Sequence, residues 1–176
     1  MMNQELEKYI RSIKNFPKDG IDFKDITTLL KDPKGLLQTG NALYDFAKEI
    51  PIDKVVGIES RGFFYGPLLA MKLQAGFVPI RKTGKLPAET VHQTYALEYG
   101  SDTIEVHKDA IAPGDKILLH DDLLATGGTA RAACDLIEKA GGEIVQISFI
   151  IELAFLNARE KFEGYDLRTL IRYDKE

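Results

Sequence analysis

The sequence has a single cysteine and no apolar run long enough to cross a bilayer. One cysteine cannot form an internal disulfide, which is typical of proteins from the reducing cytoplasm. Cys134 itself stands among apolar residues, a setting that predicts a small buried side chain rather than a nucleophile. The opening residues, MMNQELEKYI, are polar and acidic, unlike a secretory signal. We therefore expect a cytoplasmic protein with no membrane contact.

A strong charge of either sign is also missing. The chain carries 23 Lys and Arg against 27 Asp and Glu, a formal net charge of −4, and both signs are interspersed. A general nucleic-acid binder usually has a basic patch and a high pI, so we expect no nucleic-acid partner. The length of 176 residues suits one domain, residues 1–176, and no repeat or low-complexity tract divides it.

Two widespread nucleotide-binding motifs are absent as well. No lysine follows a glycine pair as in GxxxxGK[ST], and no GxGxxG follows an apolar strand pattern. The sequence therefore has neither a nucleoside-triphosphatase loop nor a dinucleotide fingerprint.

What the sequence does contain is an alternation of short apolar strands and helices. Helical spacing of apolar residues predicts helices over residues 3–13, 34–50 and 129–140, and another that ends near Gly76. Buried parallel strands are typically short, apolar and β-branched. Segments of that kind are KVVGIE (54–59), FVPIRK (77–82), KILLHDD (116–122) and EIVQISFIIEL (143–153). The order predicts an α/β fold with a central, mostly parallel sheet flanked by helices, and DLRTLIRYD (166–174) as a last edge strand.

Residues 83–107 interrupt this alternation. TGKLPAETVH has the glycine, proline and polar content of a loop, while QTYALEYG and DTIEVHK alternate like the two strands of a hairpin. We expect this segment to form a flexible β-hairpin lid.

The most informative stretch is ILLHDDLLATGGTA, residues 117–130. Its order predicts a strand, a loop of small residues and the start of a helix. The two glycines allow backbone conformations that are closed to other residues, and the helix start offers unpaired amides and a positive dipole end. These features favour a phosphate dianion, bound by Ala125, Thr126, Gly127, Gly128 and Thr129.

Two acids, Asp121 and Asp122, precede this loop at the carboxyl end of the predicted strand, the edge at which open α/β sheets bind ligands. Acids beside a phosphate would repel it unless something cationic or hydroxylic stood between them. Ribose hydroxyls and Mg²⁺ are the obvious candidates.

ILLHDDLLATGGTA resembles the 5-phosphoribosyl 1-diphosphate (PRPP) motif of type I phosphoribosyltransferases, and the surrounding sequence resembles the adenine phosphoribosyltransferase family. The resemblance extends over nearly the whole chain in the family's order and spacing. It rests on FPKDGIDFKDITTLLKDP, GIESRGFFYGPLLA, PIRKTGKLP, YALEYGSDTIEVHKDAI and IELAFLNARE.

The resemblance implies transfer of 5-phosphoribose from PRPP to N9 of adenine, which yields AMP and pyrophosphate with inversion at C1 and requires Mg²⁺. It implies that Asp121 and Asp122 bind the ribose, with metal contacts through water, and that Glu98 is the acid/base near N7 of the purine. The pyrophosphate would be bound by Arg61, Arg81, Lys82 and Lys85.

The resemblance also implies a small N-terminal hood, residues 1–33, that binds the base, with adenine near Asp22, Phe23 and Lys24 and stacked between Phe23 and Leu123. It further implies a cis peptide bond between Glu59 and Ser60, and a homodimer that buries the Arg61 region.

Two other functions remain compatible with these motifs. A sister enzyme for xanthine, guanine or hypoxanthine would need a differently equipped base pocket, because a 6-oxo purine presents an acceptor where adenine presents a donor. A regulatory protein that kept the fold and lost catalysis would usually add a DNA-binding domain, and the residues before Lys54 show no basic helix-turn-helix pattern.

Overall fold

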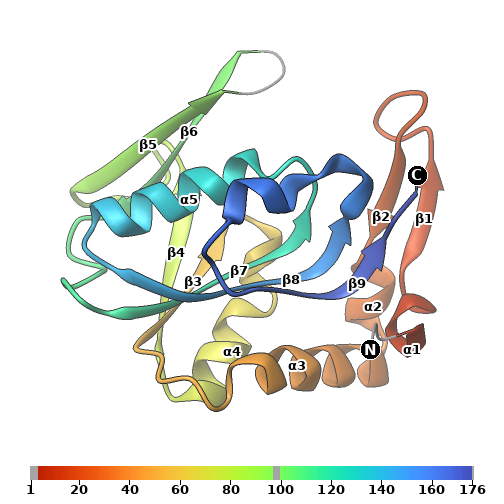
Figure 1. The fold of residues 1–176 in the computed structure, drawn as a ribbon, viewed down its shortest axis with the longest axis horizontal. Coiled ribbons are helices and arrows are strands. Elements are labelled where there is room, and N and C mark those ends of the chain that lie inside the picture. Colours follow the sequence, from red (N-terminus) through yellow and green to blue (C-terminus); the bar gives the residue numbers. More distant parts are fainter. Residues whose placement is uncertain (1–3, 97–99, 176) are drawn as a thin grey trace.

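A computed structural model describes residues 4–96 and 100–175 of the chain (Figure 1). Its helices are α1 (Gln4–Glu7), α2 (Thr27–Lys31), α3 (Pro33–Ala47), α4 (Gly66–Leu73) and α5 (Gly128–Lys139), with 3-10 turns η1 (Arg61–Phe63), η2 (Ala154–Leu156) and η3 (Ala158–Phe162). Its strands are β1 (Arg11–Lys14), β2 (Asp22–Asp25), β3 (Lys54–Ile58), β4 (Gly76–Lys82), β5 (Thr90–Ala96), β6 (Ser101–His107), β7 (Lys116–Leu124), β8 (Glu143–Leu153) and β9 (Leu167–Tyr173).

Seven strands form one central sheet in the order β5-β6-β4-β3-β7-β8-β9. The pairs β4–β3, β3–β7, β7–β8 and β8–β9 are parallel, whereas β4–β6 and β5–β6 are antiparallel. The mostly parallel α/β sheet predicted from the alternation is therefore confirmed. The C-terminal segment forms the edge strand β9, also as predicted.

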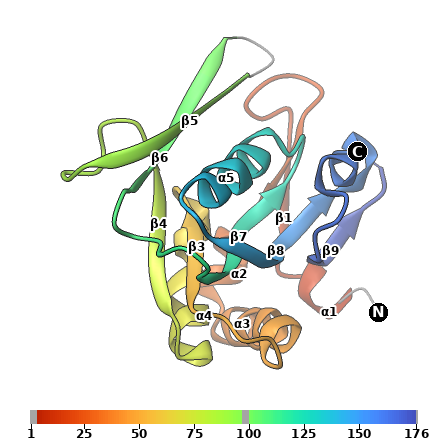
Figure 2. The same cartoon turned by 60° about the vertical axis from the view of Figure 1, so that its left-hand side comes forward.

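Helices cover both faces of this sheet, α5 on one face and α3 with α4 on the other (Figures 1 and 2). A separate apolar core lies under each layer, and Cys134 on α5 belongs to one of them with no exposed surface. Burial raises the pKa of its thiol to about 12, so it is a buried small side chain, as expected. Within the described residues, no helix has both the length and the apolar character needed to span a membrane.

The N-terminal region differs from the helix predicted over residues 3–13. The helix stops at Glu7, and Arg11–Lys14 instead forms β1, which pairs antiparallel with β2 as a separate two-stranded sheet. The side chain of Leu6 is buried in the core, with an exposure of 1%. The helix does not continue to the next apolar residues, Tyr9 and Ile10, because the chain turns there and Ile10 N donates to Glu7 O at 2.9 Å. Pairing with β2, which the local spacing cannot reveal, outweighs the helical pattern.

This two-stranded sheet lies beside the C-terminal strand β9 (Figure 1). Lys24 on β2 points its ammonium at the ring of Tyr173 on β9, with 4.4 Å between Nζ and the ring centroid. The same ammonium donates to Ser12 Oγ on β1 and to Asp22 Oδ2, both at 2.8 Å. The side chain of Lys24 thus joins both strands of the small sheet to the main one.

The predicted hairpin is present as β5 and β6, which project from the body of the molecule (Figure 2). Residues 83–89, between β4 and β5, are held to the hairpin by Glu105, a β6 residue with 5% exposure. Its carboxylate accepts the amides of Lys85 and Leu86 at 3.2 Å and the hydroxyl of Thr90 at 3.3 Å. Residues 97–99, between β5 and β6 in the sequence, lie outside the described part of the chain.

Candidate active site

The loop between β7 and α5 has the local structure that its sequence predicts. Gly127 caps α5 with φ +77°, in the left-handed region that favours glycine. A Cβ at this position would lie 3.0 Å from Phe162 and 3.2 Å from Ala158, so the η3 turn packs directly against the loop. From the same turn, Lys161 Nζ donates to the carbonyl of Thr126 at 2.6 Å. The η3 turn thereby holds the loop in place.

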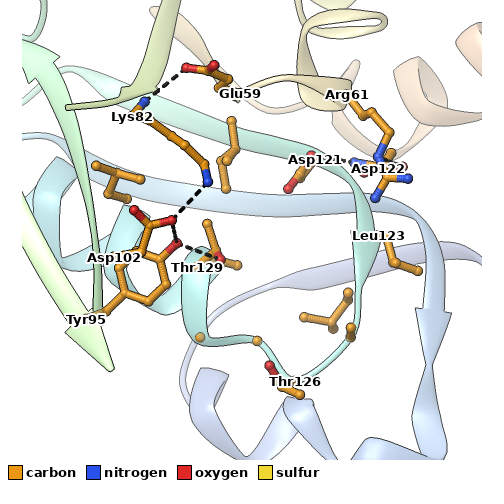
Figure 3. Close-up of a pocket in the computed structure, with 17 residues that line it drawn as sticks. Glu59, Arg61, Lys82, Tyr95, Asp102, Asp121, Asp122, Leu123, Thr126 and Thr129 are labelled. Carbon is orange, nitrogen blue, oxygen red and sulfur yellow. Dashed lines mark hydrogen bonds and ion pairs between the residues drawn. The ribbon is translucent and has the colours of Figure 1, made fainter. Parts of the chain in front are cut away.

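This loop forms one wall of a cavity of about 420 Å³, here called the loop cavity (Figure 3). The opposite walls come from the ends of β3 and β4, from η1 and from the hairpin. The lining residues that carry polar side chains are Glu59, Arg61, Lys82, Tyr95, Asp102, Asp121, Asp122, Thr126 and Thr129.

The two acids lie within β7, which continues two residues further than predicted, to Leu124. Asp121 Oδ1 accepts the amide of Asp122 at 2.9 Å, and Arg61 Nε lies 3.0 Å from Asp122 Oδ2. A Cβ on Gly62 would approach His120 O to 2.8 Å, so only glycine lets η1 lie this close to the strand. That close approach is what brings Arg61 to the acid pair.

Burial dominates the electrostatics of this acid pair. It raises the pKa of Asp121 well above its ordinary value, and the neighbouring Asp122 charge raises it further. The pKa of Asp122 is also raised by burial, although the Arg61 guanidinium opposes the shift. Polar ligands that bind carboxylates, such as hydroxyls or a cation, would therefore be stabilised here by relieving the cost of two buried charges.

Glu59 gathers the remaining basic residues at the rim of the cavity. Arg81 Nε lies 3.1 Å from Glu59 Oε2, the amide of Lys82 donates to the same oxygen at 3.0 Å, and Lys85 Nζ lies 3.5 Å from Oε1. Burial alone would raise the pKa of Glu59, but the Lys82 amide and the Arg81 guanidinium outweigh it and hold the pKa below its ordinary value. The peptide bond between Glu59 and Ser60 is cis, as expected.

A second cavity, here called the hood cavity, has a volume of about 270 Å³ and adjoins the first. Leu123 and Ala125 line both. The guanidinium of Arg61 stands over the Phe23 ring, 5.4 Å from its centroid, and so also connects the two. The remaining lining residues of the hood cavity are Ile21, Asp22, Phe23, Lys24, Leu153, Phe155 and Leu156.

Comparison with known proteins agrees with this geometry. The model of the phosphoribosyl transferase domain family matches residues 25–170. An adenine phosphoribosyltransferase of Christiangramia forsetii is 58% identical over 172 residues, which cover 96% of this chain and 99% of the relative. The chain belongs to the adenine phosphoribosyltransferase family.

Solved structures of the family have the same fold. The adenine phosphoribosyltransferase of Rhodothermus marinus superposes with a TM-score of 0.92 at 50% identity, over 97% of both chains. The Saccharomyces cerevisiae enzyme, solved with adenine and an imino-altritol bisphosphate, superposes with a TM-score of 0.90 at 41% identity, over 96% of this chain and 97% of the yeast chain.

Within this adenine phosphoribosyltransferase fold, most residues singled out from the sequence come together in space. The loop cavity collects Arg61, Lys82 and the stretch from Asp121 to Thr129, and the hood cavity collects Asp22 to Lys24 with Leu123. Arg81 and Lys85 line neither cavity and approach the site only through Glu59. Glu98 lies outside the described residues.

Three polar residues of the loop cavity were not assigned a role from the sequence. Glu59 stands inside the recognised ESRGF segment, so its position next to Arg61 was an available signal. Tyr95 and Asp102 were visible only as alternating hairpin residues. They reach the cavity because the hairpin pairs them directly across its two strands, a register that the sequence does not specify.

Proposed function

We propose that the two adjoining cavities bind the two substrates of adenine phosphoribosyltransferase, PRPP and adenine, and that the products are AMP and pyrophosphate. The observation that carries this proposal is their contact at Leu123. A phosphate-type loop, a buried acid pair and several cations surround the loop cavity, while the hood cavity beyond Leu123 is lined mainly by apolar side chains. A ligand in one cavity would meet a ligand in the other at this residue.

In the loop cavity, Ala125, Thr126, Gly127, Gly128 and Thr129 would bind the 5-phosphate through backbone amides and hydroxyls. Asp121 and Asp122 would accept the ribose hydroxyls. Arg61 would bind the pyrophosphate, together with Lys82, and Arg81 and Lys85 would complete its charge neutralisation from the rim. This assignment places the cations at the group that leaves.

In the hood cavity, adenine would stack between Phe23 and Leu123, with Asp22 and Lys24 at its edge. Asp22 Oδ2 already accepts Lys24, whereas Oδ1 is buried and accepts no hydrogen bond within the described residues. An amino group is the kind of partner that such an oxygen requires. If Asp22 turns this oxygen into the cavity when a base binds, the amino group of adenine would satisfy it, whereas the oxygen of a 6-oxo purine would not.

The chemical step joins N9 of adenine to C1 of the ribose as the bond from C1 to the pyrophosphate oxygen breaks. Positive charge develops on the ribose ring and negative charge on the pyrophosphate, so the reaction benefits from fixed cations at the leaving group and from exclusion of water. Arg61 and Lys82 supply the former, and closure of the hairpin, whose Tyr95 and Asp102 line the cavity, would supply the latter. Glu98, which lies between β5 and β6 in the sequence, would take the proton that adenine loses, acting near N7.

The donor set suits Mg²⁺ that arrives with the substrate rather than a metal held by the protein alone. No cluster of three or more His, Cys, Asp or Glu side chains suited to a metal occurs among residues 4–96 and 100–175. Mg²⁺ commonly keeps several waters and binds to one or two carboxylates plus substrate phosphates. Asp121 and Asp122 would hold it through water, and it would neutralise charge on the pyrophosphate.

An apolar stripe next to Arg61 supports a homodimer. Phe64, at the end of η1, and Leu68 and Met71, one helical turn apart on α4, are 44%, 41% and 78% exposed. Because Phe64 comes three residues after Arg61, pairing of two copies through this stripe would bury the Arg61 region. We also propose that the protein is cytoplasmic and acts in purine salvage. The free, buried Cys134 fits that compartment.

A purine-by-purine assay with PRPP and Mg²⁺ tests the activity. We expect AMP and pyrophosphate from adenine and much slower turnover of hypoxanthine, guanine and xanthine, monitored by chromatography of the nucleotide product. Turnover of hypoxanthine without adenine would replace the proposal by the sister activity. Failure with every purine would favour a regulatory protein.

A further inference from the structure

Four side chains that line the loop cavity form a continuous chain of polar contacts (Figure 3). The hydroxyl of Thr129 donates to the Tyr95 hydroxyl at 3.1 Å, and the Tyr95 hydroxyl lies 3.4 Å from Asp102 Oδ2. Lys82 Nζ lies 3.1 Å from the same Asp102 oxygen. The chain thus begins at the loop proposed for the 5-phosphate and ends at a cation proposed for the pyrophosphate.

The hairpin register holds the middle of this chain in place. Tyr95 on β5 and Asp102 on β6 are direct partners across the two strands, so their side chains lie on the same face. The other carboxylate oxygen of Asp102 accepts the amide of Thr103 at 2.8 Å, which fixes the orientation of the group. Asp102 therefore presents one oxygen to Tyr95 and Lys82 together.

We propose that Asp102 and Tyr95 are positioning residues for PRPP: Asp102 holds the Lys82 ammonium over the pyrophosphate site, and Tyr95 ties Asp102 to the 5-phosphate loop. This inference rests on the proposed function. Lys82 has a flexible four-carbon stem and a side chain that is 59% exposed, so without a partner it would sample many rotamers. An ammonium has three donors, and one directed at Asp102 leaves two for pyrophosphate oxygens.

The contact with the 5-phosphate loop is compatible with a bound phosphate. The Thr129 hydroxyl has one proton and two acceptor lone pairs, so it cannot donate to the phosphate and to Tyr95 together. If the Thr129 hydroxyl turns to donate to the phosphate, Tyr95 keeps its single proton for Asp102, and its contact with the loop is then made by the ring. The ring of Tyr95 also lies against the loop, because a Cβ on Gly128 would be 3.9 Å from Tyr95 Cδ2.

The negative charge of Asp102 would by itself repel pyrophosphate, so the two possible roles of Asp102 predict opposite changes in pyrophosphate affinity when the acid is removed. The hydrogen bond from Lys82, followed by that from the Thr103 amide, lowers the pKa of Asp102, so the carboxylate is charged at neutral pH. If Asp102 acted only through its charge, its removal would strengthen pyrophosphate binding. If it positions Lys82, its removal would weaken that binding.

The experiment is calorimetric titration of pyrophosphate with Mg²⁺ into the full chain and its Asp102→Asn, Lys82→Met and doubly substituted variants. We expect Asp102→Asn to weaken pyrophosphate binding by about three- to fivefold, the upper part of the range for a partly exposed ion pair. In the Lys82→Met background the same substitution should not weaken binding further, because only the charge of Asp102 remains to be removed. Unchanged or tighter binding in Asp102→Asn, or an equal effect in both backgrounds, would overturn the role of Asp102.

A second variant tests the link to the 5-phosphate loop. Tyr95→Phe keeps the ring and removes only the hydroxyl, and we expect it to raise KM for PRPP by about two- to threefold, the value of one hydrogen bond, while kcat changes less. Glu89→Gln is the matched control, because it breaks an exposed ion pair with Lys108 at the base of the same hairpin and should leave KM unchanged. An unchanged KM in Tyr95→Phe would refute the link.

These outcomes separate the inference from the proposed function. A parent protein that makes no AMP from adenine and PRPP refutes the function. A parent protein that makes AMP, with Asp102→Asn binding pyrophosphate as the parent does, refutes only the positioning role.

Discussion

Gly62→Ala tests the close approach of η1 to β7, on which the placement of Arg61 depends. The added Cβ would lie 2.8 Å from His120 O and 3.1 Å from Asp121 Oδ1. Strand β7 is hydrogen-bonded to β3 on one side and to β8 on the other, so the strand cannot yield and η1 must move. Overpacking of this kind costs about 1–3 kcal/mol, and each kcal/mol lowers Tm by about 2–4 °C in a domain of this size.

The same displacement carries Arg61 away from Asp122 and from the pyrophosphate site. A misplacement approaching 1 Å can cost about a hundredfold in rate, so we expect kcat/KM for PRPP to fall by at least about tenfold. Thermal melting and steady-state AMP formation measure the two effects. Gly40→Ala is the control: it is buried inside α3, its Cβ would meet Tyr65 at an ordinary 3.6 Å, and it should stabilise by about 0.5–1 kcal/mol. Parental activity and Tm in Gly62→Ala would refute the reasoning.

Three further predictions concern the acids and the surface. The raised pKa of Asp121 means that the folded chain keeps a proton that the unfolded chain loses as pH rises above the ordinary Asp value, so this acid destabilises the fold at pH 7. Asp121→Asn should therefore raise Tm at pH 7 but change it little near pH 4, while reducing AMP formation. A lower Tm at pH 7 would contradict this. Glu98→Gln should lower kcat by about a hundredfold with little change in KM for PRPP in steady-state assays, and parental kcat would remove its acid/base role. Met71→Glu should yield monomers in sedimentation experiments, and an intact dimer would place the interface elsewhere.

The sequence predicted the main sheet because each of its strands has a local signal. Strands such as β3 and β8 are runs of apolar and β-branched residues bounded by turn residues, and their burial on both faces explains that composition. The prediction of a helix over residues 3–13 was wrong for the opposite reason. Only two of the four residues of β1 are apolar or small, and its partner β2 lies eight residues further along, so nothing local competes with the helical spacing of Leu6, Tyr9 and Ile10.

The phosphate loop was predictable because its signal is contiguous, whereas the rest of the site depends on register. ATGGT needs glycine at Gly127 for a positive φ, and that requirement can be read from the sequence alone. Tyr95 and Asp102 instead enter the cavity because the hairpin pairs them directly, and a slip of one residue would turn one of them away. No local pattern in the sequence fixes that pairing.

The distribution of acids around the site has a consequence for ligand binding that the linear order of residues concealed. The sequence alone suggests that four cations are free to bind an anion: Arg61, Arg81, Lys82 and Lys85. In the fold each of them has an acidic partner, which is Asp122, Asp102 or Glu59. An incoming pyrophosphate must therefore share or displace these contacts, and its affinity is the difference between two sets of ion pairs. Partly exposed pairs are each worth about 1 kcal/mol or less, so the exchange costs little, and the acids keep the cations ordered meanwhile. The Arg61–Asp122 contact is the exception, because Asp122 is buried and breaking the contact would leave its carboxylate unpaired. We therefore expect Arg61 to bind pyrophosphate while retaining Asp122, which its several N–H donors allow.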